Sequence, residues 1–419
     1  MNKRWNISLL ITLVVFNINS NGQISSFNPV KIIGGISQKI TINGSGFGNL
    51  QGENYVTFLQ ESGSFLDTSN AKKLKYTSWS DTKIEVEMPV AYSGKIKVNI
   101  NGIDKISNDT LKVKANQGYR SANPIVYDYL NNTNGKGGYT WYMHRTYWEN
   151  PAAKTAIEDV FKEFRCKTGV NYILANAPSD AAFSLGDGIN IIGPDITLGA
   201  VGFTDRLWIS CFLGAEIFYT TKAMDIRMST TQDWYFGGGT VPSGKSKFRY
   251  VLLHELGHSL GLGHVNEIGQ TMFPSVTNLP SNNWNKRDSI TTDEQIAITY
   301  LVKLSQTFSF NACGISTLSK ISNCNDVYGL TSEIDRFKKK ITYSFYPNPA
   351  FDRIYFNTNQ QTLNGSTIRL MDILGRHIST EKINTDGIVE LYLTNLKPGS
   401  YIVEIENKNE IGRLNLIKK

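Results

Sequence analysis

Residues 254–264 read His-Glu-Leu-Gly-His-Ser-Leu-Gly-Leu-Gly-His, and this stretch decides how the rest of the chain is interpreted. His254 and His258 are four residues apart, so a helix places both imidazoles on one face, where they can hold one metal ion. Gly261 permits a left-handed turn that ends this helix and brings His264 back toward the same ion. Three neutral imidazoles leave a fourth coordination position open, which is typical of a catalytic rather than a structural zinc site.

A methionine follows the motif at a short distance. Met272 lies eight residues after His264, within Gln-Thr-Met-Phe-Pro. The extended motif and this methionine resemble the metzincin zinc endopeptidases, and most closely their matrixin branch. The resemblance implies that the three histidines bind zinc, that Glu255 is the general base and that Met272 forms a turn beneath the metal. Two positions depart from the branch patterns: Val265 is not a usual marker, and Pro274 stands where astacin-like enzymes carry a tyrosine ligand.

The composition describes a globular chain of several domains. It has 419 residues, of which 40% are hydrophobic and 19% are charged, and its net charge is +7. Its lysines are scattered, and the one dense basic run, residues 336–340, is interpreted as a solvated linker, so nucleic acid is not an expected partner. Acidic residues and backbone carbonyls leave calcium sites open, with Asp187, Asp195 and Asp205 as candidate ligands.

The first 22 residues are typical of a secretory signal peptide. Lys3 and Arg4 precede an apolar stretch at residues 7–18, which is too short to span a membrane. No later segment is long and apolar enough to cross a bilayer. We therefore expect an exported protein with no transmembrane segment once the signal is removed.

Four cysteines are expected to form disulfides in an oxidising compartment, and they allow three pairings. Proximity in the sequence favours Cys313 with Cys324, which leaves Cys166 with Cys211. A cysteine zinc site is the alternative, but no C-x-x-C spacing supports it. No cysteine segment resembling the matrixin latency switch precedes the catalytic region.

Residues 24–115 are predicted to form a β-sandwich, because short alternating strands are separated by glycine turns. The segment resembles an immunoglobulin-like IPT/TIG domain in its Gly-Ser-Gly-Phe-Gly turn, its Trp-Ser-Asp-Thr-Lys-Ile segment and its closing Gly-Lys-Ile-Lys-Val strand. Such domains serve as spacers or adhesive modules, and the spacer role is favoured.

Residues 117–310 are predicted to form the α+β metzincin catalytic domain. Outside the motif only His144 and His377 remain, and His377 lies in another domain, so a histidine-rich structural zinc site is not available. His144, at the end of the first strand, is interpreted as a residue with a local partner. The expected elements are a strand at 138–144, a helix at 151–166, strands at 170–174, 189–192, 216–219 and 223–228, the motif helix at 248–260 and a final helix at 291–301.

Residues 342–419, after a linker at 311–341, are predicted to form a second small β-sandwich. The Tyr-Pro-Asn-Pro, Leu-Gly-Arg and Pro-Gly-Ser-Tyr elements closely resemble the C-terminal sorting domain of type IX secretion cargo. The resemblance implies contact with that secretion machinery in a Gram-negative bacterium. The protein would then be secreted or attached to the outer-membrane surface.

Together these features predict a secreted zinc-dependent endopeptidase that hydrolyses extracellular proteins or peptides, with Glu255 as the general base. The substrate should lie extended along an edge strand, and residues 265–284 should shape the pocket beside the metal. The alternative is a non-enzymatic cell-surface adhesin that uses the TIG-like domain on a metzincin scaffold. The intact motif favours the enzyme.

Overall fold

The described residues of the computed structural model form two compact units, Met1–Tyr328 and Gly329–Lys419. The structure describes residues 22–119, 121–122, 125–213, 216–275, 288–307, 316–329, 339–340, 344–357, 363–372, 377–384, 389–406 and 410–419. Nearly all of the expected signal peptide and about half of the expected linker lie outside these ranges. No helix within these ranges has both the length and the apolar character that a membrane span requires.

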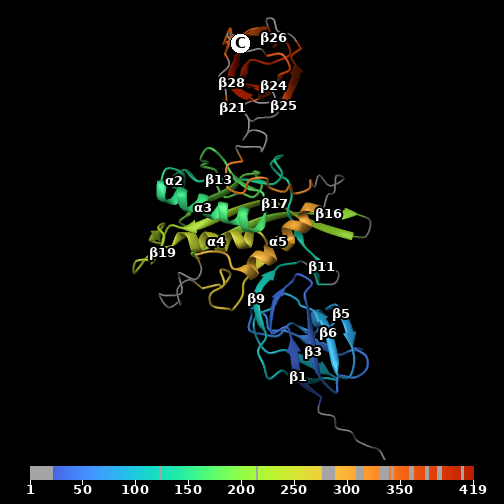
Figure 1. The fold of residues 1–419 in the computed structure, drawn as a ribbon. Coiled ribbons are helices and arrows are strands. Elements are labelled where there is room, and N and C mark those ends of the chain that lie inside the picture. The colour runs from blue at the N-terminus through green and yellow to red at the C-terminus, as the bar shows by residue number, and fades with distance from the viewer. Residues whose placement is uncertain are drawn as a thin grey trace, which may run out of the picture. The chain divides into compact units, whose positions relative to one another are not determined.

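The N-terminal module consists of short strands in a sandwich (Figure 1). One sheet has the order β1-β3-β6-β5 and another has the order β4-β7-β8. Alternate side chains of both sheets, among them Ile42, Val86 and Val98, are fully buried in one core, as the alternating pattern predicts. The elements are β1 (Gln23–Asn28), β3 (Lys39–Ser45), β4 (Tyr55–Thr57), α1 (Thr68–Lys72), β5 (Tyr76–Trp79), β6 (Lys83–Glu87), β7 (Lys97–Ile100) and β8 (Ile103–Ile106).

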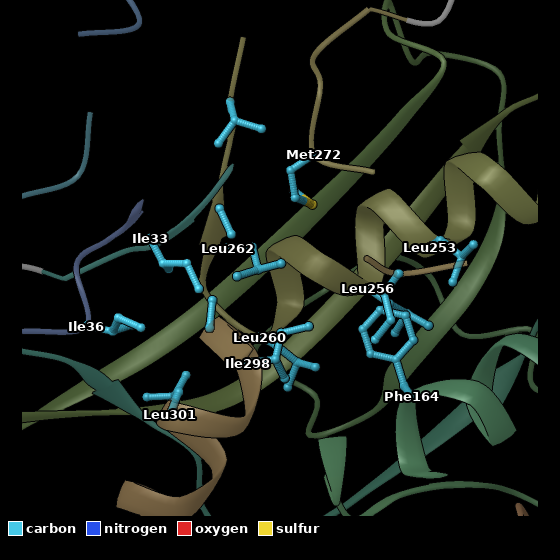
Figure 2. Packing of buried hydrophobic residues seen from close by; sticks show 14 of the residues in the cluster. Ile33, Ile36, Phe164, Leu253, Leu256, Leu260, Leu262, Met272, Ile298 and Leu301 are labelled. Carbon is cyan, nitrogen blue, oxygen red and sulfur yellow. The ribbon is translucent and has the colours of Figure 1, made fainter. Parts of the chain in front are cut away.

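A third sheet joins the module to the region that carries the histidine motif. Its order is β2 (Lys31–Gly34), β9 (Lys112–Gln117) and β20 (Leu262–Gly263), and β20 pairs antiparallel with β9. Ile33 and Ile36 of the module belong to the same buried cluster as residues after the motif helix, including Leu262 (Figure 2). The shared core is not the arrangement expected of a spacer.

The catalytic region is built on a twisted sheet of six strands. The order is β12-β17-β15-β13-β14, and β16 pairs with β17 along nearly its whole length, from Glu216 to Met228. All pairs are parallel except β16 with β17. The strands are β12 (Asp128–Tyr129), β13 (Tyr139–Met143), β14 (Tyr172–Leu174), β15 (Asn190–Asp195), β16 (Gly202–Leu213) and β17 (Glu216–Ser229). Two smaller ribbons are β10 (Ser121–Ala122) with β11 (Ile125–Val126), and β18 (Trp234–Tyr235) with β19 (Ser246–Lys247).

Two predicted strands of this sheet are wrong in detail. Residues 216–219 and 223–228 form the single strand β17, because its long antiparallel pairing with β16 keeps it continuous. The sequence interpretation did not assign β16 at all. This strand lies beside the motif helix.

The helices of this region begin and end where local signals place them. Helix α3 (Pro151–Thr168) begins after Asn150, whose side chain accepts from Ala152 and Ala153 at 3.1 and 3.2 Å. It ends at Gly169, whose φ is 74°. The other helices are α2 (Arg145–Trp148), the motif helix α4 (Phe248–Ser259) and α5 (Thr292–Thr307).

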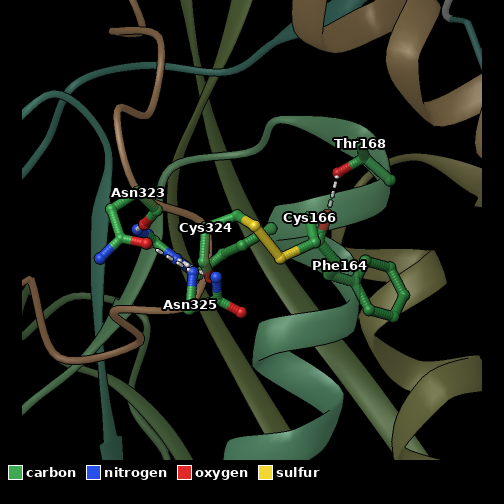
Figure 3. The surroundings of a disulfide bond; sticks show 7 residues. Phe164, Cys166, Thr168, Asn323, Cys324 and Asn325 are labelled. Atoms are coloured by element: carbon green, nitrogen blue, oxygen red, sulfur yellow. Dashed lines mark hydrogen bonds between the residues drawn. A yellow bond between two sulfur atoms is a disulfide. The ribbon is translucent and has the colours of Figure 1, made fainter.

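A disulfide joins Cys166 at the end of α3 to Cys324, which is 158 residues away (Figure 3). Arg165 also links α3 to the segment around Cys324. Its guanidinium donates to the carbonyl of Asn323 at 2.9 Å and to that of Tyr172 at 2.8 Å. The segment after α5 therefore returns to cover the end of α3.

The predicted pairings of Cys313 with Cys324 and of Cys166 with Cys211 are wrong. Cys211 is also disulfide-bonded, and Cys313 lies outside the described residues. Proximity in the sequence does not predict the pairing, because the folded chain brings Cys324 back next to α3.

The C-terminal unit has its own core. One sheet has the order β21-β28-β27-β24-β25 and the other has the order β22-β23-β26. Buried side chains of both sheets, including Ile354, Leu391 and Val403, form one cluster. The strands are β21 (Lys339–Lys340), β22 (Ser344–Tyr346), β23 (Arg353–Asn357), β24 (Thr367–Asp372), β25 (His377–Lys382), β26 (Val389–Tyr392), β27 (Gly399–Glu406) and β28 (Glu410–Lys418). Because β21 pairs with β28, this unit begins inside the expected linker.

Candidate active site

The structure brings the three motif histidines together at one point. The Nε2 atoms of His254 and His258 are 3.0 Å apart, and each lies 3.2 Å from Nε2 of His264. Helix α4 carries the first two side chains one turn apart. The chain then turns at Gly261, where φ is 83°, and β20 delivers His264. Among the described residues, these three form the one cluster of metal-ligating side chains.

Each histidine has a partner for its other ring nitrogen. Nδ1 of His254 lies 2.8 Å from the carbonyl oxygen of Thr271, and Nδ1 of His258 lies 2.8 Å from that of Leu262. Nδ1 of His264 lies 2.7 Å from a carboxylate oxygen of Glu61. These oxygens can only accept hydrogen bonds, so each Nδ1 carries the hydrogen and each Nε2 presents a lone pair.

Three converging lone pairs repel one another unless a cation lies among them. A tetrahedral zinc with Zn–N distances of about 2.0–2.1 Å separates its ligand atoms by about 3.3–3.4 Å, which is close to the observed triangle. Burial and the neighbouring His264 also lower the pKa of His258 to about 4, which favours the neutral ring that a metal requires. The donor set therefore fits zinc.

Glu255 lies beside the triangle and is 4% exposed. The hydroxyl of Thr204 on β16 is 2.7 Å from Oε2 of Glu255 and 2.8 Å from its backbone oxygen. Burial raises the pKa of Glu255 to about 7, although the bond from Thr204 opposes this shift. A Cβ at Gly202 would meet Oε1 of Glu255 at 2.7 Å, so this glycine leaves room for the carboxylate.

Met272 packs beneath the motif helix. It is fully buried beside this helix (Figure 2), and a Cβ at Gly257 would meet its sulfur at 2.5 Å. Its backbone N–H donates to Oε1 of Glu294 at 2.9 Å, and its carbonyl accepts from Val265 at 3.0 Å. Glu294 also completes a capping box with Thr291 at the start of α5. The turn is thereby fixed between α4 and α5.

A cavity of about 780 Å³ opens over the motif. One wall is β16, from Gly202 to Trp208, and the other is α4 with Phe273, Pro274 and Ser275. Among the described strands, β16 pairs only with β17, so its other edge faces this cavity. The pocket segment expected at residues 265–284 contributes in part, and residues 276–287 lie outside the described ones.

The calcium candidates have other partners in the structure. The guanidinium of Arg227 lies 3.3 Å from Asp195 and 2.6 Å from Asp205, so it offsets both charges. Asp187 accepts from the backbone N–H of Ile189 at 2.8 Å.

His144 has the local partner that the sequence suggests. Its Nδ1 accepts from the backbone N–H of Thr146 at 3.2 Å at the start of α2.

Family models match three parts of the chain. Residues 210–301, which contain the motif helix, match the matrixin family. The chain carries a matrixin domain. The IPT/TIG domain model matches residues 23–115, and the secretion system C-terminal sorting domain model matches residues 344–419. Matrixins depend on zinc, and the sorting domain marks a protein that is secreted or attached to the outer-membrane surface of a Gram-negative bacterium.

The individual relatives match only short stretches. Matrix metalloproteinase-B of Caenorhabditis elegans is 40% identical over 60 residues, which are 14% of this chain and 12% of that protein. A structural genomics protein of unknown function from Bacteroides thetaiotaomicron has 20% identity and a TM-score of 0.21 over 24% of each chain. The sulfur carrier protein SoxY of Chlorobium limicola f thiosulfatophilum has 11% identity and a TM-score of 0.16, covering 21% of this chain and 87% of that one.

Proposed function

We propose that this protein is a secreted zinc endopeptidase whose matrixin domain hydrolyses peptide bonds in extracellular proteins. The observation that carries the proposal is the convergence of three Nε2 lone pairs beside the buried carboxylate of Glu255. When bound there, zinc would polarise the scissile carbonyl and lower the pKa of its water. His254, His258 and His264 would hold the metal and leave one position open.

Residues of this chain would carry out proton transfer and substrate positioning. Glu255 would accept a proton from the attacking water and pass it to the leaving amine. Thr204 would hold that carboxylate in place through its hydroxyl. The free edge of β16 would pair with an extended peptide and thereby set its register in the cavity. A peptide-sized cleft of about 780 Å³ supports a protein or peptide substrate.

A non-enzymatic adhesin is the second candidate, and the same observations count against it. A scaffold that only displays the TIG-like module has no use for three oriented imidazoles, a buried carboxylate and an open edge strand. Each of these features is intact in the described residues.

We expect the mature chain to degrade casein, to lose this activity on incubation with a zinc chelator and to regain it when zinc is restored. The measurement is release of soluble peptides over time. A folded, zinc-loaded chain that leaves casein and gelatin intact would favour the adhesin instead.

Deleting residues 342–419 should leave an active protease in the periplasm. The C-terminal unit has its own core and contributes no residue to the described cavity, so its loss removes only the secretion signal. Fractionation of a host with type IX secretion, followed by a caseinolytic assay on each fraction, makes the comparison. Equal delivery of the intact and truncated chains to the surface or the medium would contradict the prediction.

A further inference from the structure

One carboxylate from the N-terminal module reaches the histidine cluster. Glu61 lies in the turn between β4 and α1, and its Oε1 is 2.7 Å from Nδ1 of His264. The two residues are 203 positions apart in the sequence. The other two motif histidines bond to backbone carbonyls of their own domain, so His264 differs from them in having a charged partner from another module.

The position of this contact on the ring makes Glu61 a partner of the ligand rather than a competitor for the metal. Nδ1 and Nε2 of His264 lie on different sides of the imidazole, and Nε2 faces the other two histidines. The carboxylate therefore fixes the tautomer and the ring orientation from behind, and its charge increases the basicity of Nε2.

The turn that carries Glu61 is held in a defined shape. The N–H of Gln60 donates to the carbonyl of Ser64 at 2.8 Å, and the N–H of Gly63 donates to that of Gln60 at 3.0 Å. The side-chain amide of Gln60 also donates to the carbonyl of Val90 at 3.2 Å. These bonds hold the backbone of the turn in place within the module itself.

The segment that carries His264 is fastened to the same module. The amide of Asn116 on β9, which is fully buried, donates to the carbonyl of His264 at 2.9 Å. Asn266 exchanges two hydrogen bonds with the backbone of Ser93, at 2.8 and 3.0 Å.

Glu267, one residue further along, is paired with two lysines of the module. Its carboxylate oxygens lie 3.0 Å from the amines of Lys112 and Lys114. A Cβ at Gly261 would also meet the side chain of Gln117, the last residue of β9, at 2.4 Å, so this strand lies close to the turn before His264.

We propose that the N-terminal module is part of the zinc site, with Glu61 as the positioning residue for His264. The inference rests on the proposed zinc function and adds to it a role for the module. Loss of an outer partner of a metal-ligating histidine typically weakens metal binding about 10–100-fold. We expect a loss in this range when Glu61 is removed, although the 61% exposure of its side chain places the effect toward the lower end.

The test compares Glu61→Ala, Glu61→Gln and a matched control, Glu53→Ala, in the full mature chain. Glu53 is an exposed carboxylate of the same module that pairs with Lys72. Zinc affinity is measured by competition with a chromogenic chelator, and the visible spectrum is recorded after replacement of zinc by cobalt(II). We expect about tenfold weaker zinc binding and an altered cobalt spectrum in Glu61→Ala, partial recovery in Glu61→Gln because its amide oxygen still accepts the bond, and no change in Glu53→Ala.

The outcomes separate the two proposals. If the parent chain binds zinc and Glu61→Ala binds it equally well with the same cobalt spectrum, only the role of Glu61 is overturned. If Glu53→Ala weakens zinc as much as Glu61→Ala does, the effect belongs to the general stability of the module and the role of Glu61 is again overturned. A folded parent chain without zinc affinity would overturn the zinc function and this inference together.

Discussion

Glu255→Ala is expected to keep the fold and the zinc but to lower proteolysis by several orders of magnitude. The loss should exceed the factor of about 10²–10⁴ that an acid–base group contributes alone, because Glu255 would also position the water. Its carboxylate accepts a hydrogen bond from Thr204, and it is not part of the metal-ligating cluster found among the described residues. The measurement is kcat/KM on a fluorogenic peptide together with zinc content.

Glu255→Gln is the matched control for packing. Glutamine keeps the size of the side chain and an oxygen that can accept the bond from Thr204, but it does not take a proton from water. Both variants should therefore be inactive while unfolding at temperatures close to that of the parent. Near-normal cleavage by either variant would contradict the role of Glu255.

His258→Ala is expected to abolish stable zinc binding. The parent chain should hold about one zinc ion, because three imidazoles converge on one point with Nε2 separations of 3.0–3.2 Å. The two histidines that remain in the variant should bind zinc far more weakly than the three of the parent chain. Elemental analysis after dialysis gives zinc per chain, and proteolysis should fall with the metal.

His144→Ala serves as the control for this experiment. His144 is a histidine of the same domain that caps α2 and lies outside the cluster. Its loss should leave zinc content unchanged. A His258→Ala chain that retains a full equivalent of zinc after dialysis would show that the metal is held elsewhere.

Much of the local structure was predictable from residue spacing. The interval between His254 and His258 matches one helical turn, and α4 carries both side chains. The apolar periodicity after Pro151 predicted α3, which extends two residues past the expected end at residue 166. The family models also match the N-terminal, motif-bearing and C-terminal regions that the sequence separates. The two helices were predictable because they depend on residues only a few positions apart in the sequence.

The strand beside the motif was not predictable in the same way. In β16, the exposed aromatic side chains of Phe203 and Trp208 flank a partly buried run that is mainly polar, residues 204–207. This pattern lacks the apolar run that marks a buried strand, because one edge of β16 is open and its polar residues line the cavity. A strand that lines the cavity therefore lacks the sequence pattern of a strand buried in the core.

The sequence by itself determined the histidine motif, the C-terminal sorting domain and the order of the matched domains. Only the tertiary structure decided the partner of Cys166, the wall of the cleft and the contact of Glu61 with His264. The physical reason is that the spacing of residues in the sequence predicts only contacts between residues a few positions apart. These three contacts join segments that are about 50 to 200 residues apart in the sequence. Such segments meet because burying Ile33, Leu262 and their neighbours in one core closes the module onto the matrixin domain.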